Sequence, residues 1–121
     1  MTENKNTKTY DLEERTFQFA KRNRIFVKML QRTIGNIEDG KQLVRSSGSV
    51  GANYIEANEA LSKKDFVLRA KICRKEAKES RYWLRLIDIN ENLKLEKERD
   101  ALIQEATELM NIFGAIIRKS E

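Results

Sequence analysis

Apolar residues recur at every third or fourth position along most of the chain, with polar and charged residues between them. Because an α-helix turns once in about 3.6 residues, this spacing gathers the apolar side chains of each segment on one face. The pattern predicts four amphipathic helices, over about residues 11–33, 41–61, 63–90 and 94–118, after a polar leader over residues 1–9 that is expected to be disordered. Short connections then predict an all-α fold, an antiparallel up-down-up-down four-helix bundle over residues 10–121.

The third predicted helix has the most regular register. Its apolar and small residues follow one another in alternating steps of four and three, which is typical of the buried seam of a bundle. They are Phe66, Ala70, Cys73, Ala77, Ser80, Leu84 and Ile87. Ser62 followed by Asp65 resembles a capping box, with Asp in place of the usual Glu or Gln, and predicts a helix start near residue 63.

The second predicted helix contains Gly48 and Gly51 beside several serines. A glycine inside a helix costs about 1 kcal/mol relative to alanine, so we expect a neighbouring helix to approach closely at this point. In an antiparallel hairpin the small residues of the third helix would lie opposite those of the second. Arg45 of the same helix has two interpretations, an ion pair with Glu76 or Glu79 across the hairpin, or an exposed position.

Composition supports helices and excludes several kinds of site. The chain has no proline, and 36% of its residues are charged. It has no histidine and one cysteine, so neither an intramolecular disulfide nor a His/Cys zinc site is expected, and a reducing cytoplasm suits both facts. No run of about 18 uncharged apolar residues and no signal-like apolar N-terminal stretch occurs, so we expect a soluble protein with no membrane partner.

Positive charge is concentrated on the third predicted helix. Between residues 63 and 85, nine basic residues stand against three acidic ones, a local +6 that exceeds the +5 of the whole chain. Five of the basic residues fall within about 80° of one another on a helical wheel, clear of the seam. We call this set the basic stripe: Lys71, Arg74, Lys78, Arg81 and Arg85.

The basic stripe has two interpretations. A run of charge is usually a solvated surface, but these cations are not interleaved with Glu as ordinary helix pairs would be, which favours contact with phosphates or an acidic protein. Such contact would not read nucleotide sequence. Tyr82 or Trp83 could stack on an unpaired base, although Trp83 lies away from the stripe and is expected at an interface.

Further apolar residues lie at or beyond the edges of the predicted seams. They include Phe17 and Ile25, and they amount to more apolar surface than a small bundle leaves in contact with water. We therefore expect self-association. The predicted interface residues are Trp83, Leu86, Ile103 and Met110.

Catalytic chemistry has little support in the sequence. Residues 35–42 match the first seven positions of a phosphate-binding loop, but Gln42 replaces the Ser or Thr that contacts magnesium, so a plain helix–helix loop is expected. Glu56 and Glu59 have the spacing of di-metal bundles but lack the histidine of that motif. Cys73 lies in the seam and is expected to be a core residue. We expect no catalytic residue, no metal and no cofactor.

Two segments resemble a known family, QLVRSSGSVGANYIEA (residues 42–57) and KEAKESRYWLRLI (residues 75–87). The family is that of bacterial four-helix bundle proteins, whose members include proteins encoded within intervening sequences of 23S rRNA genes. A related branch is the accessory variability protein of diversity-generating retroelements. The resemblance spans about residues 10–119. The motif residues are Arg45, Ser46, Ser49, Val50, Gly51, Asn53, Glu56, Glu76, Glu79, Arg81, Tyr82 and Trp83.

The resemblance implies an antiparallel four-helix bundle that assembles into a homopentamer. It also implies a positively charged surface that binds nucleic acid and, in the retroelement branch, the reverse transcriptase, without a known catalytic set. Our hypothesis is therefore a non-enzymatic, cytoplasmic homo-oligomer that binds RNA or DNA non-specifically through the basic stripe. The alternatives are an adaptor for an acidic partner such as a reverse transcriptase, and a bundle whose stripe is consumed in pairing between subunits.

Overall fold

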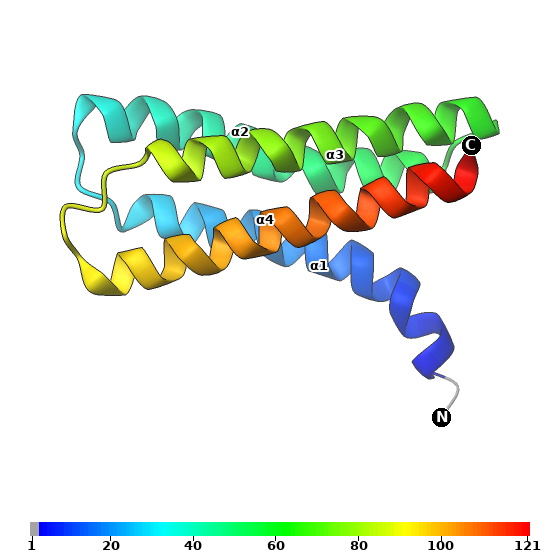
Figure 1. Cartoon of the computed structure of the whole chain (residues 1–121), viewed down its shortest axis with the longest axis horizontal. Helices are drawn as coiled ribbons and strands as arrows, with labels where there is room; N and C mark the ends of the chain where they lie inside the picture. The colour runs from blue at the N-terminus through cyan, green and yellow to red at the C-terminus, as the bar shows by residue number, and fades with distance from the viewer. Residues whose placement is uncertain (1–2) are drawn as a thin grey trace.

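Four α-helices make up the structure, a computed structural model that describes the backbone of residues 3–121 and the side chains of residues 12–121. They are α1 (Glu3–Lys28), α2 (Ile34–Asn58), α3 (Lys63–Leu86) and α4 (Leu93–Ser120). Each helix runs antiparallel to the one before it (Figure 1), so the predicted all-α bundle is confirmed. The disorder predicted for residues 1–9 falls on residues whose side chains lie outside the described part, and it stays a prediction.

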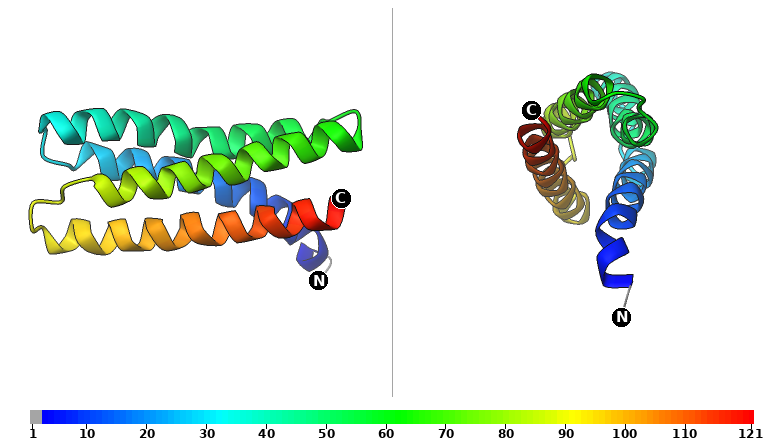
Figure 2. Two further views of the ribbon diagram at one scale, coloured as in Figure 1. Left: turned by 45° about the horizontal axis from the view of Figure 1, so that its top comes forward. Right: turned by 90° about the vertical axis from the view of Figure 1, so that its right-hand side faces the viewer.

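The helices surround one core. Each helix packs against the next along the chain and α4 returns to α1 (Figure 2); the α2–α3 contact is the most extensive and the α1–α4 contact the least. Across the centre, the rings of Tyr54 and Phe113 meet edge to face with centroids 5.7 Å apart. The largest buried side chains come from all four helices and include Phe19, Phe26, Leu43, Val50, Leu84, Leu102, Leu109 and Phe113.

Small residues determine how closely α1 and α2 approach. A Cβ added to Gly51 would lie 3.0 Å from Oγ1 of Thr16 and 3.6 Å from its backbone carbonyl carbon. Thr16 is buried and cannot move aside without moving α1, so only glycine permits this contact. A Cβ on Gly48 would likewise lie 3.1 Å from the guanidinium of Arg24. The close approach predicted for this helix is confirmed at Gly51, and the helix that approaches is α1; at Gly48 the neighbour is only the end of a flexible side chain.

The link between α1 and α2 differs from the prediction. α1 ends five residues and α2 begins seven residues earlier than expected. The reason is Thr33, which was assigned to the end of the first helix but is the N-cap of α2, with an extended backbone and a side chain that accepts a hydrogen bond from the N–H of Asn36 at 3.1 Å. Gly35, at the start of the loop expected over residues 35–42, therefore lies in the first turn of α2.

Asn36 joins the two links at this end of the bundle. Its buried side-chain amide donates to the carbonyl oxygens of Asp88 and Gln31, at 2.8 and 3.0 Å, and its side-chain oxygen accepts from the N–H of Asp88 at 2.9 Å. The α1–α2 link is thus held against the α3–α4 link. Sequence reasoning missed this role because the partner lies 52 residues away along the chain.

The end of α3 also differs from the prediction. It was expected near residue 90, but the helix ends at Leu86 because Ile87 is extended and Asn90 and Glu91 have positive φ values of 54° and 58°. Two successive residues in the left-handed region cannot continue a right-handed helix.

The α2–α3 connection is capped as predicted. The side chain of Ser62 accepts a hydrogen bond from the N–H of Asp65 at 3.1 Å, which confirms the start of α3. Leu61 was assigned to the apolar face of the second helix. Because α2 ends at Asn58, Leu61 falls in the connection and is 98% exposed.

The glycine contact predicts opposite effects of one substitution at two positions of α2. Gly51→Ala is expected to lower the free energy of unfolding by about 1–2 kcal/mol, because overpacking against Thr16 outweighs the gain in helix propensity. Gly35→Ala is the matched control. Nothing lies within 4 Å of a Cβ there, so it is expected to raise the free energy of unfolding by up to about 1 kcal/mol. Urea unfolding followed by circular dichroism measures both, and a stabilised Gly51→Ala variant would contradict the close approach.

Candidate nucleic-acid interface

α3 holds the basic stripe on the outside of the bundle because its opposite face is tightly packed. That face carries alanine, cysteine and serine, which bring α3 close to α2. The hydroxyl oxygens of Ser46 and Ser80 lie 2.8 Å apart, and Sγ of Cys73 donates to the carbonyl oxygen of Val50 at 3.3 Å. The buried seam predicted for the third helix, with small residues of α2 opposite those of α3, is thereby confirmed.

Two members of the basic stripe contact α4. Nζ of Lys71 lies 3.3 Å from a carboxylate oxygen of Glu121, but both side chains are half-exposed, and an ion pair of this kind contributes little. The guanidinium of Arg81 donates to Oγ1 of Thr107 at 3.2 Å. The hydroxyl is a neutral acceptor, so this bond orients Arg81 and leaves its charge uncompensated.

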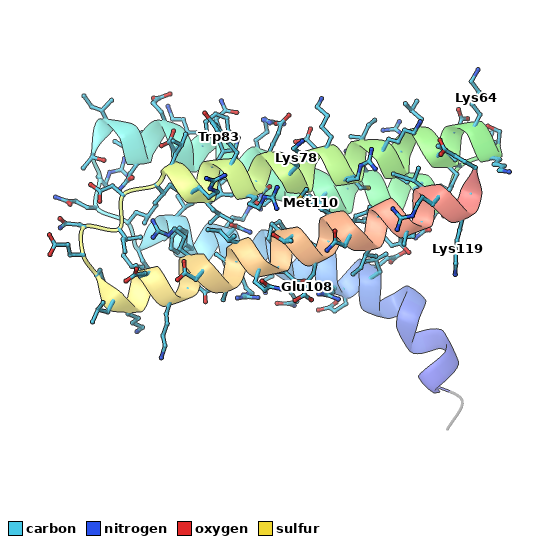
Figure 3. The ribbon with its side chains drawn as sticks, viewed as in Figure 1. Lys64, Lys78, Trp83, Glu108, Met110 and Lys119 are labelled. Carbon is cyan, nitrogen blue, oxygen red and sulfur yellow. The ribbon has the colours of Figure 1, made fainter. Side chains whose placement is uncertain are left out.

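The other three members are exposed and make no such contact. Arg74, Lys78 and Arg85 form no side-chain hydrogen bond or salt bridge with any residue in the part of the chain that the structure describes. Figure 3 shows Lys78 on α3 and Glu108 on the side of α4 that faces away from α3. Within residues 12–121, the basic stripe is therefore only partly neutralised.

The two glutamates in the middle of α3 are directed toward α2. Arg45 of α2 lies 3.4 Å from a carboxylate oxygen of Glu76, which is buried, and 3.1 Å from one of Glu79. The Arg45 side chain is 51% exposed, so both interpretations of this residue hold in part: it is ion-paired and still partly in water. These carboxylates consequently compensate a charge on α2 and lie on the side of α3 away from the basic stripe.

The glutamates of α4 are directed toward α1. Arg15 donates from Nε and Nη2 to both carboxylate oxygens of Glu105, at 2.6 and 2.9 Å, and from Nη2 to Glu108 at 2.6 Å. Arg22 lies 3.4 Å from Glu98 two turns away. These ion pairs join α1 to α4, the two helices with the least extensive contact in the bundle. The acidic side of α4 therefore faces α1 and is directed away from α3.

Two groups in this network, Arg15 and Glu108, have shifted pKa values. A hydrogen bond to Glu105 is the main cause that raises the pKa of the Arg15 guanidinium, against the opposing effect of burial. The pKa of Glu108 is lowered, first by the hydrogen bond from Gln104 and then by that from Arg15. Glu108 therefore stays ionised to a lower pH in the folded chain than an ordinary glutamate would.

The four predicted interface residues do not form one patch. Trp83 is half-buried on the side of α3 toward α2, whereas Met110 lies between α3 and α4 (Figure 3). Ile103 is partly buried and packs against the core, and Leu86 is exposed. The assignment of these residues to an interface between subunits stays a prediction.

Other apolar side chains are exposed on the outside of the bundle. Ile25 and Met29 of α1 line a groove of about 430 Å³ against Leu95 and Ala101 of α4. Phe17 lies outside the apolar face of α1, as its register predicted, with the Lys21 ammonium 5.6 Å from its ring centroid. Sequence periodicity located these residues off the seam but did not predict the groove.

The residues considered for chemistry show little support for it. Burial raises the pKa of the Cys73 thiol to about 12, which leaves almost no thiolate at neutral pH. Residues 35–42, expected to form a loop, lie within α2 instead, because Thr33 starts that helix early. Glu56 and Glu59 are exposed, and no three potential metal ligands gather anywhere in the described residues. None of the described helices is long and apolar enough to span a bilayer.

Comparisons with known proteins agree with this architecture. A family model for 23S rRNA-intervening sequence proteins matches residues 8–115. A crystal structure of a protein of unknown function from the S23 ribosomal protein family of Bacteroides thetaiotaomicron is similar, with a TM-score of 0.72 and 30% sequence identity, over 87% of this chain and 96% of that one. No curated protein matches the chain.

The α1–α4 ion pairs predict a pH dependence of stability. The lowered pKa of Glu108 means that its contribution is present above the usual glutamate pKa and is lost as the pH falls through the folded-state value. Arg15→Met should lower the free energy of unfolding at pH 7 by about 1–2 kcal/mol and flatten its decline between pH 6 and pH 3.

Arg22→Met is the matched control, since its pair with Glu98 is longer and more exposed. It is expected to cost less than about 1 kcal/mol. Urea unfolding at a series of pH values provides the comparison. An Arg15→Met variant with the same pH profile as the parent chain would contradict the role given to these pairs.

Proposed function

The chain belongs to the family of 23S rRNA-intervening sequence proteins, and on that premise we propose that it is a non-enzymatic, self-associating bundle that binds nucleic acid through the basic stripe. The observation that carries the proposal is that Arg74, Lys78 and Arg85 have no partner within residues 12–121, while glutamates of α3 and α4 pair with arginines of α2 and α1. Unpaired cations on one face attract a polyanion, because binding releases the counterions condensed on it.

Binding of this kind is non-specific. α3 lies between α2 and α4, so the face it offers is broader than the single helix, about 10–12 Å across, that a major groove of about 12 Å can admit. The basic stripe therefore meets phosphates and does not reach base edges. RNA is the first candidate, because the family description names a ribosomal RNA, and DNA presents the same phosphates.

Self-association is part of the same proposal. Ile25 and Met29 are each at least half-exposed at the groove between α1 and α4, and Leu86 and Leu93 are exposed on α3 and α4. Apolar surface of this extent favours contact with another copy of the chain. The homopentamer that the family resemblance implies is the assembly we propose.

A second candidate function uses the same cations. An acidic protein, such as a reverse transcriptase, could occupy the basic stripe in place of nucleic acid, and exposed Tyr82 and Leu86 beside the stripe suit a protein surface. A titration with labelled RNA at moderate salt separates the two candidates. If micromolar protein produces no change in the signal of the labelled RNA, the adaptor function is favoured.

Reversing the unpaired charges tests the proposed surface. The triple variant Arg74→Glu, Lys78→Glu and Arg85→Glu is expected to abolish detectable binding of labelled RNA while the chain remains folded, because the three side chains have no partner in the described fold. In the parent chain, log affinity should fall linearly with log salt, and each phosphate contact should contribute a slope of about −0.7 to −0.9. Fluorescence anisotropy over a range of salt concentrations measures both.

The control variant is Lys28→Glu, Lys97→Glu and Lys119→Glu. It changes the net charge equally, and all three lysines are exposed and outside the basic stripe. It should retain binding with a modest loss. Equal losses in the two triple variants would show that only net charge matters, and retained binding by the stripe variant would show that the surface is wrong.

The proposed assembly predicts a mass in solution. Light scattering during gel filtration should report five times the 14.2 kDa of one chain, for the parent and for the stripe variant alike. A monomeric parent chain would contradict self-association. A pentameric parent with a monomeric stripe variant would instead show that the cations pair between subunits.

A further inference from the structure

Tyr82 is exposed beside the basic stripe. Its side chain is 54% exposed, and it follows Lys78 by four residues and precedes Arg85 by three. Residues three and four apart are neighbours on a helix surface, so the ring adjoins two cations that have no partner in the described residues. A strand whose phosphates contact both cations, about 10 Å apart along the helix axis, runs alongside this ring, within reach of an unpaired base.

The ring is held in place by its neighbour. Tyr82 and Trp83 are arranged edge to face, with centroids 5.0 Å apart and an interplanar angle of 75°. Trp83 is half-buried and packs against the core, so it provides a fixed support. It can cover at most one face of the Tyr82 ring. A ring that is already positioned loses little conformational freedom when another planar group stacks on its free face.

We infer that the basic stripe takes an unpaired single strand, with one base stacked on Tyr82 and the flanking phosphates on Lys78 and Arg85. This inference rests on the proposed function and narrows its ligand from nucleic acid in general to unpaired single strands. In a duplex each base is paired and covered by its neighbours, so no base face is offered to a side chain. Unpaired bases stack on aromatic rings without regard to sequence, and both RNA and DNA single strands have the required chemistry.

The test compares single-stranded and duplex probes on the full chain. The probes are a fluorescein-labelled uridine 12-mer, a thymidine 12-mer of DNA and a 12-base-pair RNA duplex, followed by anisotropy. Tyr82→Ala is expected to weaken binding of the single strands by about 5- to 160-fold, which corresponds to the range found when stacked aromatic side chains are removed. It should change binding of the duplex by less than a factor of two. A loss with only one of the two single strands would show which sugar the site accepts.

Two variants serve as controls. Tyr82→Phe keeps the ring and should bind single strands within a factor of two of the parent chain. Phe17→Ala removes an aromatic ring of nearly equal exposure, 55%, from α1 and should leave binding unchanged. Circular dichroism and gel filtration confirm that each variant is folded and assembled. Parental single-strand affinity in Tyr82→Ala, or equal losses for single strand and duplex, would overturn the inference.

Trp83 provides a second readout. It is the only tryptophan in the chain, so its emission reports on the surroundings of Tyr82 without a label. The uridine 12-mer should change this emission at the concentration that saturates anisotropy, and the duplex should not. If Tyr82→Ala binds normally while the Arg74, Lys78 and Arg85 charge reversal abolishes binding, the inference fails and the proposed function stands. If the charge reversal also binds normally, the proposed function fails.

Discussion

The contact between α2 and α3 is the constraint on which the rest of the structure depends. Small side chains meet in its middle, where the hydroxyl oxygens of Ser46 and Ser80 lie 2.8 Å apart. At this separation Arg45 reaches across from α2 to both Glu76 and Glu79. Larger seam residues would push the helices apart and lengthen these ion pairs, which would leave the buried carboxylate of Glu76 without its partner. Close packing in the core thus determines how the carboxylates of α3 are paired.

The same separation of charge recurs on α4. Its glutamates contact arginines of α1, on the side away from α3, through Arg15 and Arg22. Acidic residues on two consecutive helices are therefore paired on the flanks, and the positive side of α3 remains between them with few compensating groups. A chain with a net charge of only +5 can in this way present a concentrated basic surface, because the position of its carboxylates matters more than their number.

Periodicity predicted much of the fold, and its failures have identifiable causes. The α3 register was predicted because every seam position follows from local spacing, and Ser62 was identified as a cap because its partner is three residues away. The role of Asn36 was missed because it bonds to Asp88 on a distant part of the chain. Thr33 was misassigned for a local reason, since it was counted in the first helix although its side chain caps α2 three residues before Asn36. The stripe itself follows from a helical wheel. A helical wheel does not predict which of these cations lack partners. Arg81 meets Thr107 of α4 and Lys71 meets Glu121 just after α4, and only the tertiary structure brings these residues near.

The central claim is that a single strand binds along the basic stripe, and the chemical reactivity of its Lys78 tests this most directly. Acetylation followed by mass spectrometry, with and without a saturating uridine oligomer, compares Lys78 with Lys28, Lys97 and Lys119 in one sample. The account predicts that the oligomer protects Lys78 while the three reference lysines, all exposed and outside the basic stripe, stay as reactive as in the free protein. Unchanged reactivity of Lys78 at saturation would contradict it.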